Sequence, residues 1–128
     1  TILFFLKSSF YAFLILTSKS GKIVSLHVSC TEWKNTFSYE IYGKNGKLSI
    51  NGLGGSYGVE KLTHYKMLPK MGPPETITYE YPMLDNSWLV EINQFYDDII
   101  FDREPESNLD NAISVHKIIK ESYAHNKE

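Results

Sequence analysis

The sequence has 128 residues and a single cysteine, Cys30. One cysteine excludes an internal disulfide and also a zinc site built from several thiolates. A lone thiol is typical of a reducing compartment, which predicts a cytoplasmic location. Because Cys30 closes the alternating run that begins at Lys22, we expect a buried strand residue rather than a nucleophile.

The sequence also lacks an excess of basic residues and a long apolar run. Thirteen Lys and Arg stand against fifteen Asp and Glu, a formal charge of −2. Nucleic-acid-binding domains usually gather a basic surplus on one face, so nucleic acid is not an expected partner. Lys7 separates the apolar runs Ile2–Leu6 and Phe10–Leu16, whereas a membrane span needs about 20 predominantly apolar residues. We therefore expect two buried segments there and no membrane partner.

Aromatic residues are abundant, at 14% of the chain. Hydrophobic residues make up 42% and charged residues 22%, which is close to the globular average and unlike a disordered or coiled-coil chain. A chain of this length suits one domain of ordinary size. We therefore predict a single domain spanning residues 1–128.

The first two thirds of the chain have the period of β-strands. Phe10–Thr17 is apolar on both faces, which predicts a central strand. The break Gly43-Lys44-Asn45-Gly46 predicts a hairpin, with Asn45-Gly46 supplying the positive φ angles of its turn. Alternation predicts the remaining strands at Lys22–Cys30, Phe37–Tyr42, Leu48–Ile50, Val59–Leu68 and Glu75–Tyr81.

The last third changes to a helical period. Apolar residues from Trp88 to Ile100 recur at helical spacing after the N-cap candidates Asp85, Asn86 and Ser87. Pro105 ends this helix, and Ser107 with Asp110 forms a capping box that opens a second one, Leu109–Tyr123. Strands followed by helices predict an α+β fold: a mainly antiparallel open sheet with two C-terminal helices packed on one face.

The segment Gly52–Gly58 is rich in glycine and follows a predicted strand. A dinucleotide fingerprint needs G-x-G-x-x-G between a strand and a helix. Here Tyr57 occupies the position of the third glycine, and a strand pattern follows. We therefore expect a glycine-rich connection whose bare backbone can lie close to a ligand, and no NAD or NADP binding by this chain.

The sequence contains no complete catalytic constellation and no metal-ligand spacing. The residues most suited to a ligand are Trp33, Lys34 and Tyr57. The hairpin places the corner Thr31–Lys34 and the loop Gly52–Gly58 at the same edge of the sheet. An indole, an ammonium group and a phenol suit a polyhydroxylated ring. The alternative is that Trp33 and Tyr57 pack against each other and cap the sheet.

The order of several motifs is similar to that of a known family. Gly21–Leu26 resembles its "nG-x-i-a-x-l" strand, and Glu40–Leu48 resembles its "e-i-x-G-x-x-G-x-l" hairpin. Gly52–Leu62 resembles the segment that follows in sugar-related members, and Trp88 to Tyr123 resembles the closing helices. From Gly21 to Tyr123 the chain resembles the C-terminal domain of the Gfo/Idh/MocA family, which includes glucose-fructose oxidoreductase and inositol dehydrogenase.

The resemblance implies an NAD(P)-dependent oxidoreductase acting on sugars, inositols or nucleotide-linked sugars. The family's Rossmann domain, its Glu-Lys-Pro lysine and its catalytic histidine have no counterpart here, and Phe10-Tyr11 stand where the family has an Asp. We therefore expect a fragment that is inactive alone, with NAD or NADP held outside it and no catalytic, cofactor or metal residue within it. The other hypothesis is a stand-alone α+β binding or dimerisation module.

The resemblance also implies a homodimer through the sheet. In the family the helices cover one face and a second subunit meets the other. Phe37, Tyr39 and Ile41 can face the helices. A mixed polar and aromatic surface, which resembles a non-obligate interface, is left on the opposite side: Ser25, His27, Ser29, Ser38, Glu40 and Tyr42.

Overall fold

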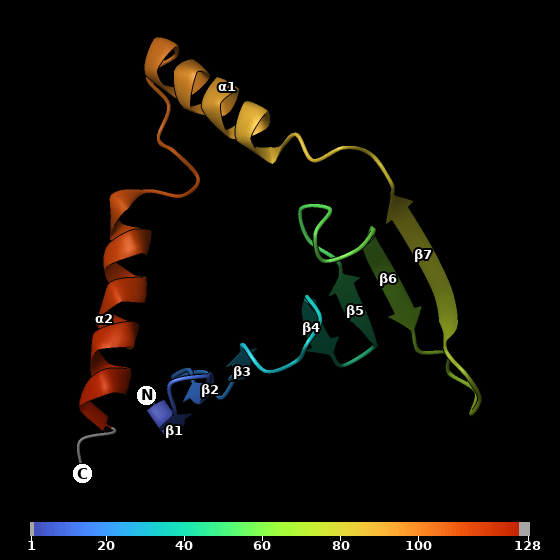
Figure 1. Cartoon of the computed structure of the whole chain (residues 1–128). Coiled ribbons are helices and arrows are strands. Elements are labelled where there is room, and N and C mark those ends of the chain that lie inside the picture. Colours follow the sequence, from blue (N-terminus) through green and yellow to red (C-terminus); the bar gives the residue numbers. More distant parts are fainter. Residues whose placement is uncertain (1, 126–128) are drawn as a thin grey trace. The chain divides into compact units, whose positions relative to one another are not determined.

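The structure is a computed structural model that describes residues 2–125 (Figure 1). It divides into two compact units, one formed by the chain up to Trp33 together with the part from Phe95 onward, the other by Lys34–Gln94. Strands precede helices, as predicted for an α+β protein. The elements are β1 (Ile2–Lys7), β2 (Tyr11–Thr17), β3 (Ile23–Ser29), β4 (Ser38–Gly43), β5 (Gly46–Asn51), β6 (Glu60–Lys66), β7 (Glu75–Tyr81), α1 (Ser87–Ile100) and α2 (Leu109–His125).

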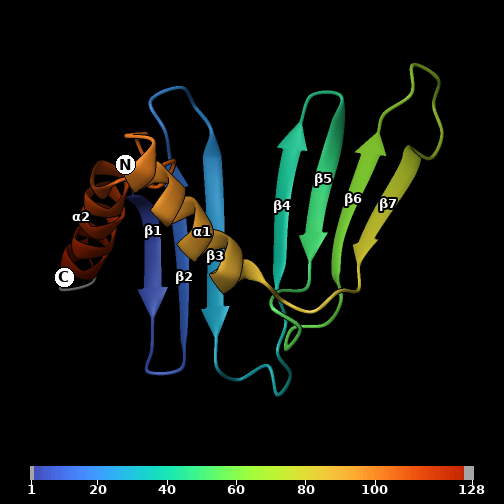
Figure 2. The same ribbon diagram turned by 90° about the horizontal axis from the view of Figure 1, so that it is seen from above.

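The strands form two antiparallel sheets rather than one open sheet. Their orders are β1-β2-β3 and β4-β5-β6-β7, and Figure 2 shows the strands of each sheet side by side. The α+β class and the antiparallel pairing are therefore confirmed. Alternation predicts β3 to β7, but it does not specify the partner of an edge strand. Both β3 and β4 are edge strands, and the chain between them includes Trp33 with a positive φ of 55°.

In the three-stranded sheet β2 is the central strand, as its two apolar faces predicted. Helix α2 packs against β1. The rings of Tyr123 and Phe5 meet edge-on with their centroids 6.1 Å apart, and the Lys7 ammonium lies 4.0 Å from the centroid of the Tyr123 ring. The expectation of a buried Cys30 was wrong, because β3 ends at Ser29 and the thiol is exposed.

The four-stranded sheet has one apolar and one polar face. Its register aligns Tyr39, Ile50, Leu62 and Tyr79 across the four strands. The neighbouring row on the other face is Glu40, Ser49, Thr63 and Thr78. Because side chains alternate along a strand, these two rows lie on opposite faces of the sheet.

The hairpin between β4 and β5 forms, but its turn lies one residue earlier than predicted. Gly43 pairs with Gly46, so Lys44 and Asn45 make the turn, and none of Lys44, Asn45 and Gly46 has positive φ. Gly46 is needed for another reason. A Cβ there would collide with the backbone carbonyl of Tyr65 in β6, so glycine permits the close approach of the two strands.

Both helices begin close to their predicted positions. The Val90 N–H donates to the Asn86 carbonyl at 3.0 Å, so the cap of α1 is one of the three predicted candidates. The capping box at Ser107 and Asp110 was wrong. Asn108 is the cap of α2, since its side-chain oxygen accepts from the Asn111 N–H at 3.1 Å.

Within residues 2–125, neither helix has the length and apolar character needed to cross a membrane.

Candidate ligand-binding site

The loop between β5 and β6 is built from glycines in the left-handed region. Gly52, Gly54, Gly55 and Gly58 have φ angles of 82°, 54°, 71° and 91°. The loop leads into strand β6, as the alternation predicted, and a helix would be required for a dinucleotide fingerprint. The loop therefore offers exposed backbone but lacks the helix N-terminus that binds a pyrophosphate.

Three contacts fix the path of this loop. Gly52 is buried, and a Cβ on it would overlap the carbonyl group of Val59. The Gly54 N–H donates to Glu60 Oε1 at 2.8 Å, and the Tyr57 N–H donates to the Leu53 carbonyl at 3.2 Å. The glycine-rich connection is thus a defined turn that is held to the first residue of β6.

The start of β4 and the glycine loop meet at one end of the four-stranded sheet. The Gly52 N–H donates to the Phe37 carbonyl at 3.4 Å, and Asn35 Nδ2 donates to the Ser56 carbonyl at 3.5 Å. The sequence predicted that the corner Thr31–Lys34 and this loop share one edge of the sheet, and the contacts found at this edge are made by Asn35 and Phe37. The site is thus supported by two segments that are distant in sequence.

The three predicted ligand-binding residues are all solvent-accessible. Trp33 ends the N-terminal segment of the first unit, and its side chain is 100% exposed. Lys34 is exposed, and Tyr57, in the same unit as Lys34, is 41% exposed.

A cavity of about 500 Å³ lies beside the glycine loop. It is lined by Gly55, Gly58, Val59, Glu60 and the stretch from Tyr81 to Ser87, which joins β7 to α1. Sequence reasoning did not find this cavity. The sequence marks Asp85 only as a helix-cap candidate, and Glu60 carries no motif that marks a binding residue.

Asp85 is held in place by the beginning of α1. Its Oδ1 accepts from the Ser87 N–H at 3.0 Å, and a Cβ placed on Gly54 would lie 3.2 Å from its Oδ2. The hydrogen bond from the Ser87 backbone, followed by that from the Ser87 hydroxyl, lowers the pKa of Asp85 below its ordinary value. The carboxylate is therefore ionised at neutral pH.

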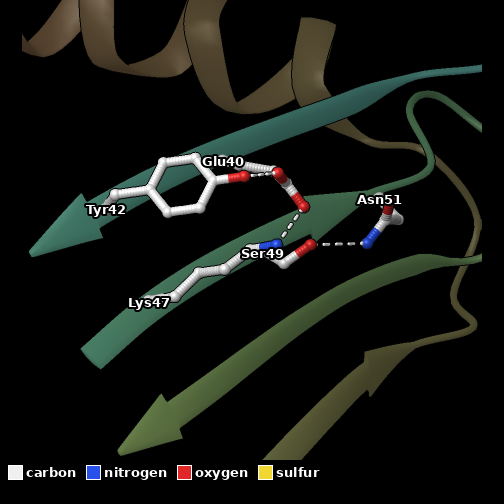
Figure 3. A network of polar contacts seen from close by, with 5 residues as sticks. All are labelled: Glu40, Tyr42, Lys47, Ser49 and Asn51. Carbon is white, nitrogen blue, oxygen red and sulfur yellow. Dashed lines mark hydrogen bonds and ion pairs between the residues drawn. The ribbon is translucent and has the colours of Figure 1, made fainter.

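The polar face of the four-stranded sheet carries a network that is separate from the cavity (Figure 3). Glu40 accepts from the Tyr42 hydroxyl and pairs with Lys47, while the Asn51 amide donates to Ser49 Oγ at 3.0 Å. The ammonium group of Lys47, and then the Tyr42 hydroxyl, lower the pKa of Glu40, and Glu40 raises the pKa of Lys47. These charges already satisfy one another.

The surface expected to form a dimer is divided between the two sheets. Ser25, His27 and Ser29 belong to β3, whereas Ser38, Glu40 and Tyr42 belong to β4. His27 stacks on Phe13 with ring centroids 4.2 Å apart. The residues of the surface predicted from the sequence therefore belong to two different sheets.

Comparisons of this chain with protein-family models, curated proteins and solved structures give no match. Among the described residues, no group of three or more His, Cys, Asp and Glu side chains is placed to hold a metal ion.

Proposed function

We propose that this chain is the substrate-side and oligomerisation part of an NAD(P)-dependent sugar or inositol dehydrogenase. In this proposal a polyhydroxylated small molecule binds at the loop end of the four-stranded sheet. The observation that carries it is the meeting of the β4 start and the glycine loop through Asn35 and Ser56, beside a cavity of about 500 Å³. Cavities of this size are typical of small-molecule sites.

The residues of the chain do not fit the nicotinamide cofactor. The glycine loop is followed by β6, and the adjacent cavity carries the carboxylates of Glu60 and Asp85. A pyrophosphate would be repelled by these charges and would find no array of free helix N–H groups. The cofactor is therefore assigned to a part of the enzyme outside these residues, and the chain alone is inactive. The lone Cys30 supports a cytoplasmic location.

The binding of a polyol is tested by titrating the full chain with D-glucose and myo-inositol in a calorimeter or by NMR. We expect saturable binding that Trp33→Ala and Tyr57→Ala each weaken about three- to tenfold, because each removes an aromatic face worth roughly 0.5–1.5 kcal/mol. Lys34→Ala removes a hydroxyl-binding ammonium group and should weaken binding in the same direction.

The matched control is Tyr96→Ala, which removes an aromatic ring of α1 that is 63% exposed. This variant should bind as the unchanged chain does. Equal weakening by Tyr96→Ala, or no binding of either polyol, would contradict the proposed site. Micromolar binding of NAD or NADP would contradict the assignment of the cofactor to another part of the enzyme.

A second candidate is a stand-alone module that dimerises through a sheet face. It is favoured by the apolar face of the four-stranded sheet, where large side chains are between 36% and 53% exposed. An exposed apolar patch of this kind is typical of an interaction surface. The residues concerned are Tyr39, Ile41, Leu48, Ile77, Tyr79 and Tyr81.

Light scattering at tens of micromolar tests the oligomeric state. We expect the mass of a dimer, and Ile41→Lys with Tyr79→Lys should shift it to a monomer because two buried charges destabilise an apolar interface. Tyr42→Lys is the matched control: it changes the polar face that the sequence predicted as the interface, and it should leave a dimer formed through the apolar face intact. A monomer mass for the unchanged chain would argue against dimerisation.

A further inference from the structure

The cavity beside the glycine loop has an apolar wall. Tyr81 ends β7, and Pro82, Met83 and Leu84 continue from it towards α1. Met83 is 79% exposed and Leu84 is 94% exposed, so large apolar surfaces lie open beside the cavity. The C–H face of a small ring would cover such a surface favourably.

The polar part of the cavity lining includes two carboxylates, those of Glu60 and Asp85. Glu60 uses Oε1 to accept from the Gly54 N–H at 2.8 Å, and Asp85 uses Oδ1 to accept from the Ser87 N–H at 3.0 Å. Each carboxylate is thus oriented by a backbone donor. Asp85 also accepts from the Ser87 hydroxyl, whereas Oε2 of Glu60 has no hydrogen-bond partner among the described residues and can accept from a ligand.

The negative charge of the two carboxylates is not neutralised by any basic residue that lines the cavity. The lining residues include Glu60 and Asp85 but no Lys, Arg or His. A phosphate or carboxylate on a ligand would therefore be repelled, whereas an ammonium group would be attracted. Asn86 and Ser87 add polar groups suited to hydroxyls.

We infer that this cavity binds an amine-bearing polyhydroxylated ring, such as an amino sugar or an aminocyclitol, with its ammonium group directed to Glu60 and Asp85. The inference rests on the proposed function, in which a polyhydroxylated molecule is the ligand, and adds the charge that the ligand carries. The apolar wall from Tyr81 to Leu84 covers one face of the ring. Phosphorylated and nucleotide-linked sugars are excluded as ligands of this cavity.

The test compares D-glucosamine, D-glucose and D-glucosamine 6-phosphate as ligands of the full chain by NMR titration at low ionic strength. We expect D-glucosamine to bind about three- to tenfold more tightly than D-glucose, since partly exposed ion pairs give modest gains. The phosphorylated sugar should bind most weakly. The preference for the amine should shrink as salt is raised.

The variants Glu60→Gln and Asp85→Asn remove the charges but retain oxygens that can accept from Gly54 and Ser87. Each should reduce the preference for D-glucosamine over D-glucose. The matched control is Glu80→Gln, because Glu80 pairs with Lys61 on the polar face and does not line the cavity. This control should keep the full preference.

The possible failures are distinguishable. Equal binding of D-glucose and D-glucosamine, or a preference that Glu60→Gln and Asp85→Asn leave unchanged, overturns the inference while the proposed polyol site stands. Binding of D-glucosamine alone, with the expected loss in both variants but no effect of Trp33→Ala or Tyr57→Ala, supports the cavity and contradicts the predicted residues. No binding of any of the three sugars overturns both.

Discussion

Gly52→Ala is expected to be one of the most destabilising single substitutions in the four-stranded sheet, lowering the free energy of unfolding by roughly 2–4 kcal/mol. Two effects add. Gly52 has a φ of 82°, which a residue with a Cβ adopts at a cost, and that Cβ would overlap the carbonyl group of Val59. Urea unfolding followed by far-UV circular dichroism measures the loss.

Gly55→Ala is the matched control for this substitution. Gly55 belongs to the same loop and has a φ of 71°, but a Cβ on it would meet nothing within 4 Å. It therefore reports the backbone cost alone, which is roughly 1–2 kcal/mol. Equal losses in the two variants would show that the overlap with Val59 relaxes at no cost, and the structural role assigned to Gly52 would be wrong.

The elements that the sequence predicted well are those whose side chains alternate or recur with a clear period. The predictions Val59–Leu68 and Glu75–Tyr81 correspond to β6 and β7, and the helix beginning after Asp85 corresponds to α1. Periodicity depends on which side chains face the same way, and this information is local. It therefore places the strands and helices without any knowledge of their partners.

The cap of α2 and the turn between β4 and β5 differ from the predictions. In both places more than one residue of the sequence suits the required backbone geometry. Ser107 and Asn108 are both competent caps, and the structure uses Asn108 because its side-chain oxygen reaches the Asn111 N–H. Similarly, Asn45-Gly46 suits a tight turn, yet Gly46 is required in the strand by the approach of β6. The sequence thus shows that a glycine stands at position 46. It does not show whether the turn or the neighbouring strand requires it.

The candidate site could be predicted only in part for a related reason. The predicted hairpin put the corner before β4 and the glycine loop at the same edge of the sheet, and Asn35 contacts Ser56 there. The cavity was not predicted, because Glu60 and Asp85 are distant in sequence and each is oriented by a backbone N–H group of another residue. An isolated carboxylate in a sequence resembles any solvated acidic residue until the fold supplies its neighbours.

Gly46→Ala is the second substitution for which we expect a large loss, roughly 1–3 kcal/mol in the free energy of unfolding. Gly46 does not have positive φ, so the loss arises from the contact with β6 alone. Pairing of Gly46 with Lys66 and the hydrogen bond from the Met67 N–H to the Asn45 carbonyl, at 2.9 Å, lie at the same end of the sheet. Amide hydrogen exchange should therefore show the greatest loss of protection at Met67 and its neighbours.

Gly43→Ala separates this steric effect from a general effect of changing glycine in a strand. Gly43 pairs directly with Gly46, but a Cβ on it would meet only the Gly46 carbonyl oxygen, at an ordinary 3.4 Å. Its free energy of unfolding should change by no more than about 0.5 kcal/mol. If Gly43→Ala destabilises the protein as much as Gly46→Ala, or if Met67 stays protected in Gly46→Ala, the close approach of β5 and β6 is not what requires glycine at position 46.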